Sequence, residues 1–88
     1  MQEIRVPISI NRLDLRRPTV AHMHAAKEAL ESLLEQSENV KSYVLYVVED
    51  VPGWFIQGSV LFVVEDDDPQ TRAEEALEQL LDELLEGY

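Results

Sequence analysis

The chain has 88 residues and no cysteine, and its 18 acidic against 7 basic residues give a formal net charge of −11. This length predicts one domain spanning residues 1–88, and the composition excludes disulfides and thiolate chemistry. The charge argues against direct binding of nucleic acid or anionic membranes across the whole surface. A domain of this size buries only about 60% of its unfolded surface, so dimerisation is an obvious way to gain buried area.

Membrane and export signals are not predicted. Apolar runs such as VLYVV and VLFVV are much shorter than the roughly 20 residues that span a bilayer. The N-terminal stretch MQEIRVPISI lacks the cationic start and continuous apolar segment of a signal peptide. We therefore expect a soluble cytoplasmic protein.

The first element is a predicted strand over residues 2–10. Its apolar residues alternate with polar ones, so that one face carries Ile4, Val6, Ile8 and Ile10. Pro7 has no N–H group to donate to a neighbouring strand, which predicts a position at the edge of a sheet. The polar stretch NRLDLRRPT that follows predicts a loop.

A helical period begins at Val20, with Thr19 as the expected N-cap after Pro18. The helix is expected to end near residues 37–39. Its apolar stripe consists of Met23, Ala26, Leu30, Leu33 and Leu34.

Two further strands are predicted at residues 41–49 and 54–65. Pro52 and Gly53 between them suit a type II turn, which indicates an antiparallel hairpin. Gly58 indicates a bulge or a close contact within the second of these strands. The more consistently apolar face of that strand carries Trp54, Ile56, Val60, Phe62 and Val64.

The last element is a predicted helix that starts after the acidic run Glu65–Asp68. Asp68 suits the N-cap, Pro69 suits the first helical position, and Gly87 suits the C-cap. A broad apolar stripe is formed by Ala73, Ala76, Leu77, Leu80, Leu81, Leu84 and Leu85.

The predicted order is therefore β-α-β-β-α, an α+β protein. A right-handed crossover makes the first two strands parallel, and the third strand can insert between them. The expected result is a three-stranded sheet of order 1-3-2 with both helices on one face. This element order resembles a ferredoxin-like fold without its last strand, and the resemblance carries no functional motif.

Two helices can cover only one face of this sheet. If the even positions of the third strand face the helices, Phe55, Leu61 and Val63 face away. One alternating set of the second strand accompanies them, either Tyr43, Leu45 and Val47 or Val44, Tyr46 and Val48. Large exposed apolar patches usually mark interfaces, so we expect self-association or partner binding here; the alternative is that loops or the last helix fold over this face. The candidate apolar contacts are Tyr43, Phe55, Leu61 and Val63.

No metal, cofactor or catalytic motif is predicted. The run Glu65–Asp68 lacks the alternating ligands and the glycine of a calcium loop. His22 and His24 lie about 200° apart on a helix and cannot bind one metal from the same face. Phosphate loops, nucleophile elbows and H-E-x-x-H motifs are absent from the sequence. We therefore expect a non-enzymatic protein, with an enzyme acting through His22 or His24 as an alternative.

The acidic residues of the last helix lie mainly opposite its leucines. Such a row is the solvated side of an amphipathic helix, and it can also imitate the phosphates of nucleic acid. In size and charge the chain resembles small acidic inhibitors of phage origin, namely DNA mimics and inhibitors of bacterial defence systems. The same acidity also fits salt adaptation. Our first hypothesis is an acidic interaction module, forming a homodimer or docking on a partner through the bare sheet face. Its candidate contacts with a basic protein surface are Glu75, Glu78, Asp82 and Glu86.

The second hypothesis is a dimeric ferredoxin-like domain that binds a small ligand in a regulatory or accessory role. An anion could then be held near the start of the first helix by Arg12, Arg16 and Arg17. The simpler interpretation of these arginines is a solvated loop that pairs with carboxylates elsewhere.

Overall fold

The computed structural model describes residues 2–11, 20–50 and 53–86 of the chain. Its elements follow the predicted order. They are β1 (Gln2–Asn11), α1 (Val20–Gln36), β2 (Val40–Asp50), β3 (Gly53–Val64) and α2 (Pro69–Glu86). The predicted caps at Thr19 and Gly87, and Pro52 of the predicted turn, lie outside the described residues.

The three strands form one sheet in the order β1-β3-β2, and both pairings are antiparallel. The first two strands therefore run parallel to each other, with the third between them, which confirms the predicted topology. β1 is an edge strand, as the missing N–H of Pro7 predicts. The arrangement is compatible with a ferredoxin-like fold that lacks its last strand.

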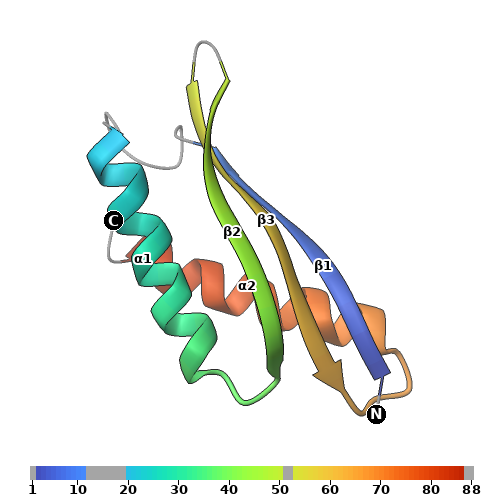
Figure 1. Cartoon of the computed structure of the whole chain (residues 1–88). Coiled ribbons are helices and arrows are strands. Elements are labelled where there is room, and N and C mark those ends of the chain that lie inside the picture. Colours follow the sequence, from blue (N-terminus) through green and yellow to red (C-terminus); the bar gives the residue numbers. More distant parts are fainter. Residues whose placement is uncertain (1, 12–19, 51–52, 87–88) are drawn as a thin grey trace.

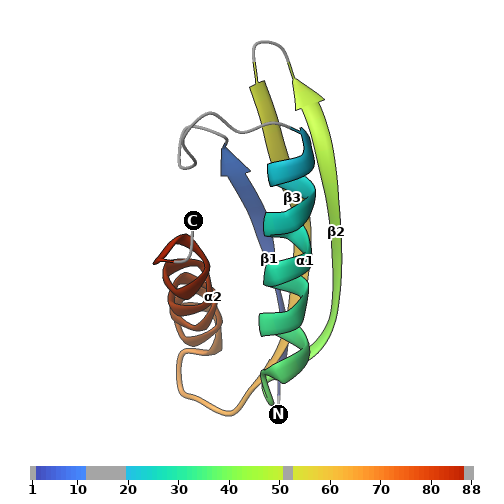
Figure 2. The same cartoon turned by 90° about the vertical axis from the view of Figure 1, so that its left-hand side faces the viewer.

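Both helices cover the same face of the sheet, so the molecule has two layers. In Figure 1, α1 runs beside β2 and α2 passes behind the strands at a steep angle. Figure 2 shows the sheet to the right of α2, with α1 in front. The core between the layers is apolar and consists of Val6, Ile8, Ile10, Met23, Ala26, Leu30, Leu34, Ile56, Val60, Phe62, Val64, Ala73, Leu77 and Leu84.

The even positions of β3 face the helices, as predicted, since Ile56, Val60 and Phe62 have no exposed surface. Tyr43 pairs with Val60, and Val47 pairs with Ile56. Because directly opposite residues lie on the same face, Tyr43, Leu45 and Val47 are on the helix side, where they pack against the core. Of the two sets left open for β2, Val44, Tyr46 and Val48 accompany Phe55, Leu61 and Val63, and the choice of Tyr43 as a contact on that face is wrong.

Gly58 lies in the middle of β3, opposite Ile8 of β1 and Leu45 of β2. Its φ is +150°, a conformation that side-chain-bearing residues rarely adopt. A Cβ atom placed on Gly58 would lie 1.8 Å from the carbonyl oxygen of Val44. The predicted close contact is confirmed, and it brings the backbones of β2 and β3 together where no side chain fits.

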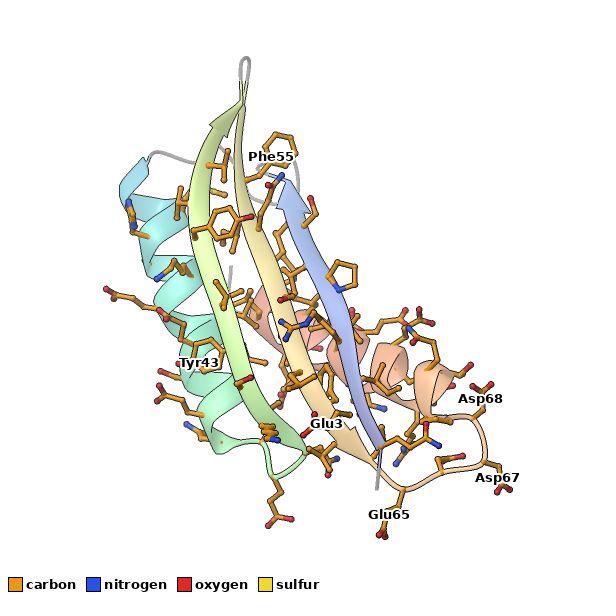
Figure 3. All side chains as sticks on the ribbon, turned by 45° about the vertical axis from the view of Figure 1, so that its right-hand side comes forward. Glu3, Tyr43, Phe55, Glu65, Asp67 and Asp68 are labelled. Atoms are coloured by element: carbon orange, nitrogen blue, oxygen red, sulfur yellow. The ribbon has the colours of Figure 1, made fainter. Side chains whose placement is uncertain are left out.

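The start of α2 follows the predicted capping chemistry. The Asp68 carboxylate accepts hydrogen bonds from the Thr71 backbone N–H at 3.3 Å and from the Thr71 hydroxyl at 2.7 Å. Pro69 is the first helical residue, where its missing N–H is harmless. The Asp66 carboxylate accepts a hydrogen bond from the Asp68 N–H at 3.2 Å. Part of the acidic run is thus engaged in ordering the β3–α2 connection, which is seen at the lower right of Figure 3.

Candidate interaction surfaces

We call the side of the sheet that faces away from the helices the outer face. In Figure 3 the strands lie in front of the helices, and the labelled residues Glu3 and Phe55 lie at opposite ends of this face. The register assigns its side chains. They are Glu3, Arg5, Pro7 and Ser9 of β1, Ser42, Val44, Tyr46 and Val48 of β2, and Phe55, Gln57, Ser59, Leu61 and Val63 of β3.

The outer face carries exposed apolar side chains along β2. Val44 is 58% exposed and Tyr46 is 48% exposed, the largest values among the described large hydrophobic residues. Phe55, Leu61 and Val63 are half-buried on the neighbouring strand. The apolar surface is not continuous, because Tyr46 lies opposite Gln57 and Val44 lies opposite Ser59. The outer face is therefore a mixed surface, with neutral polar groups at its centre.

The β1 side of the outer face is polar and internally paired. The Arg5 guanidinium donates a hydrogen bond to the Ser59 hydroxyl at 3.1 Å. The Lys41 ammonium group pairs with the Glu3 carboxylate. Both contacts are exposed, so each contributes little to stability. The Lys41–Glu3 pair cancels two of the three charges, and Arg5, bonded to a neutral hydroxyl, retains its positive charge.

A β-bulge explains why Lys41 reaches Glu3. The register between β2 and β3 shifts between Val40 and Ser42, so Lys41 is the extra residue. The ladder resumes beyond the bulge, where the Val63 N–H donates to the Asn39 carbonyl at 2.8 Å. A bulge re-aims the side chain at its position, and the Lys41 side chain thereby spans β3 to reach β1. No sequence signal at this position indicates the shift.

The exposed side of α2 carries the second candidate surface. We call Glu75, Glu78, Asp82 and Glu86 the carboxylate row; all four side chains are exposed. Residues three or four positions apart lie along one side of a helix, so these four form one row. Ala73, Leu77 and Leu84 are buried on the other side of α2. The Arg72 guanidinium lies 3.9 Å from the Glu75 carboxylate, a long and exposed contact.

Charge is distributed unequally between the two layers. Residues 65–86 contain ten of the eighteen acidic residues and one basic residue, Arg72. The helices lie on the side of the sheet opposite the outer face (Figure 2). The carboxylate row and the outer face are therefore separate surfaces, one strongly negative and the other close to neutral.

Tyr43 takes part in a contact between the layers. Its hydroxyl donates a hydrogen bond to the Glu35 carboxylate of α1 at 2.7 Å. This hydrogen bond, with a smaller contribution from burial and from the negative charges of Glu35 and Glu31, raises the pKa of Tyr43 from 10.0 to about 12. A predicted partner contact is thus engaged within its own chain.

A cavity of about 390 Å³ lies between the end of α1 and α2. Its walls carry neutral polar groups, small apolar groups and one carboxylate. They are formed by Ser37, Asn39, Ala76, Gln79, Leu80 and Glu83. This lining combines hydrogen-bonding groups with one negative charge and holds no histidine, cysteine or basic residue.

The remaining predicted sites are only partly described. Arg12, Arg16 and Arg17 lie outside the described residues, and so does the side chain of His22. His24 is exposed on α1. Within residues 2–11, 20–50 and 53–86, no group of three or more histidine, cysteine, aspartate or glutamate side chains is placed to hold a metal ion.

Neither helix of the described chain has the length and apolar character needed to cross a membrane. Comparison with protein-family models, with curated proteins and with solved structures finds no match to the chain.

Proposed function

We propose that the chain is a small acidic, non-enzymatic interaction protein of the cytoplasm that binds a basic protein surface. The carboxylate row of α2 makes the contact. An inhibitor from a phage or mobile element that imitates DNA is the most concrete form of this proposal. The observation that carries it is that four exposed carboxylates form one row on a single helix.

The spacing of the row supports imitation of phosphates. A helix rises about 1.5 Å per residue, so neighbouring members are about 4.5 to 6 Å apart along the axis and the whole row spans about 16 Å. Phosphates follow one another at about 3.4 Å per strand along the axis of DNA. A protein that binds several successive phosphates through lysine and arginine therefore meets charges of similar density on α2.

The residues around the carboxylate row strengthen its negative electrostatic potential. Arg72 is the single cation of residues 65–86, and its contact with Glu75 is long and exposed. Glu74 and Glu83 add further exposed carboxylates on the same helix. Charge complementarity of this kind raises association rates and is weakened by salt. Binding should therefore fall steeply as the salt concentration rises from about 50 mM to about 200 mM.

A pair of variants with equal net charge tests the proposal. Binding to purified basic DNA-binding proteins is measured with and without competing duplex DNA. The row variant carries Glu75→Gln, Glu78→Gln, Asp82→Asn and Glu86→Gln. The scattered variant removes the same number of charges elsewhere, from exposed residues without a described contact, by Glu28→Gln, Glu38→Gln, Glu65→Gln and Asp67→Asn.

The expected result is a loss of at least about tenfold in affinity for the row variant and a smaller loss for the scattered variant. Duplex DNA should compete with the wild-type chain for the same basic protein. Equal losses in the two variants would mean that net charge alone, and not the row, governs binding. Unchanged binding of the row variant would overturn the proposal.

A further inference from the structure

We infer that the outer face binds a second copy of this chain, so that two sheets pack face to face and the helices lie on the outside. This inference goes beyond the proposed function, because it uses the opposite surface of the molecule. Its starting point is the exposure of Val44 and Tyr46, at 58% and 48%, on a face that no described helix covers.

The charges on the outer face indicate which kind of partner it can bind. Among the described side chains of the strands, Glu3 and Arg5 are the charged members of the outer face, and Lys41 of the bulge pairs with Glu3. A basic partner is drawn to the helical layer, where the carboxylates are. An acidic contact surface finds only the charge of Arg5 to pair with among the described side chains of this face. A second copy carries the same net charge of −11, but it presents a face with few charges and keeps its carboxylate row on the far side of its own sheet.

Sheet-to-sheet packing also keeps the acidic layers apart. Stacked sheets lie about 10 Å apart, and each helix lies roughly 10 Å behind its own sheet. The two α2 helices of such a dimer are therefore separated by about 30 Å, which is several Debye lengths at about 0.1 M salt. Pairing through the helices would instead bring two carboxylate rows together. The outer face is thus the surface at which two highly charged copies can meet.

The centre of the face is chemically suited to meeting its own copy. Across a two-fold axis, residues close to the axis face their own counterparts. Gln57 and Ser59 lie on the central strand of the face and Tyr46 lies opposite Gln57 on β2, and each of these side chains can both donate and accept a hydrogen bond. Identical groups of this kind can pair with each other, whereas two carboxylates cannot. The polar groups that interrupt the apolar surface are therefore compatible with burial in a symmetric interface.

The size of the face predicts a weak dimer. The three strands have 10, 11 and 12 residues, so the face measures about 35 Å by about 14 Å, or roughly 500 Å² per copy. A pair of such faces buries about 1,000 Å², slightly below the usual range for stable complexes. We therefore expect a dimer with a dissociation constant in the micromolar range.

Sedimentation velocity from about 1 µM to about 500 µM tests this inference, since a micromolar dimer changes its population across that range. The wild-type chain should pass from monomer to dimer. Val44→Glu places a carboxylate in the middle of the outer face and should weaken dimerisation at least about tenfold. Gln79→Glu adds the same charge to the exposed side of α2 and should leave the dimer unchanged. Circular dichroism establishes that both variants are folded.

Cross-linking provides a second measurement that does not depend on Val44→Glu folding. The chain has no cysteine, so a single introduced thiol reports its own position. Tyr46→Cys should give a covalent dimer with a short bismaleimide, whose reach matches the separation of about 10 Å between packed sheets. Glu83→Cys on α2 should remain monomeric under the same conditions.

Three outcomes would overturn the inference. One is a chain that stays monomeric at every concentration. Another is a dimer that tolerates Val44→Glu in a folded chain. The third is a dimer in which Tyr46→Cys is not cross-linked. None of these outcomes bears on the binding of basic proteins by the carboxylate row. A folded Val44→Glu chain should bind basic proteins as the wild type does. Failure of the dimer and failure of the proposed function are thus distinguishable.

Discussion

The hydroxyl of Tyr43 in β2 donates a hydrogen bond to the carboxylate of Glu35 in α1, with 2.7 Å between the oxygens. This bond joins the margin of the sheet to the helix that covers it, and it raises the pKa of Tyr43 from 10.0 to about 12. Because the protonated phenol is the donor, loss of its proton breaks the bond and places two negative charges next to each other.

We expect the stability contributed by Tyr43 to be lost in alkaline solution. The pKa is higher in the folded chain than in the unfolded one, so the contribution is complete below pH 10 and disappears as the pH rises toward about 12. Urea unfolding followed across this range should show a steeper decline for the wild type than for Tyr43→Phe, which lacks the titrating group. Parallel declines in the two proteins would contradict the assignment.

Replacement of Gly58 by alanine should strongly destabilise the sheet. The new Cβ would lie 1.8 Å from the Val44 carbonyl oxygen, and the backbone has a φ of +150°. The clash is with backbone, so β2 has to move away from β3 rather than a side chain rotating. We expect a loss of at least about 2 kcal/mol in the free energy of unfolding. Ser59→Ala, one residue further on the exposed outer face, is the control and should lose less than about 1 kcal/mol.

Asp68→Ala should reduce stability by about 1 kcal/mol, because it removes the N-cap of α2. Asp67→Ala removes an equal charge from the adjacent exposed residue, for which no hydrogen bond is described. The difference between the two variants in thermal or urea unfolding therefore isolates the bonds from Asp68 to Thr71. Equal losses would indicate that the charge near the helix dipole, and not the cap, is responsible.

The features predicted correctly from sequence are those fixed by local chemistry and strong periodicity. The alternation of apolar and polar residues predicts the strand β1, and the helical period of apolar residues predicts α1 and α2. Asp68 before Pro69 predicts where α2 begins. Each of these patterns is compatible with only one local structure. The order 1-3-2 follows because a right-handed crossover leaves a gap that the hairpin can fill. The even positions of β3 were identified because its odd positions include Gln57 and Ser59, which suit a solvated face.

The features that could not be predicted from the sequence depend on the register between strands that are distant in the chain. β2 is apolar on both faces, so hydrophobicity does not distinguish Tyr43 from Val44 as the outward residue. The pairing of Tyr43 with Val60 settles this, and it depends on the bulge at Lys41. The approach of Lys41 to Glu3 crosses the whole sheet. The apolar patch expected on the outer face is interrupted by Gln57 and Ser59, two odd positions of β3 whose polarity is visible in the sequence itself.

The two phenylalanines of β3 provide a direct test of which face is the core. Phe62 is completely buried between the sheet and the helices, whereas Phe55 is half-buried on the outer face. Phe62→Ala should lower the free energy of unfolding by about 3 to 5 kcal/mol, because it removes contacts on all sides and leaves a cavity. Phe55→Ala should lose less than about half of that at dilute protein, where the second copy is absent.

The loss expected for Phe62→Ala can prevent a small domain from folding at all. Phe62→Leu and Phe55→Leu then serve as a milder matched pair, and Phe62→Leu should again be the more destabilising of the two. Raising the protein concentration should increase the loss caused by Phe55→Ala, since the dimer buries the outer face, and should leave the loss caused by the Phe62 variants unchanged. If Phe55→Ala proved the more destabilising substitution at dilute protein, the assignment of the two faces would be reversed. Val44 and Tyr46 would then face the helices instead of solvent, and the dimer interface proposed for the outer face would no longer hold.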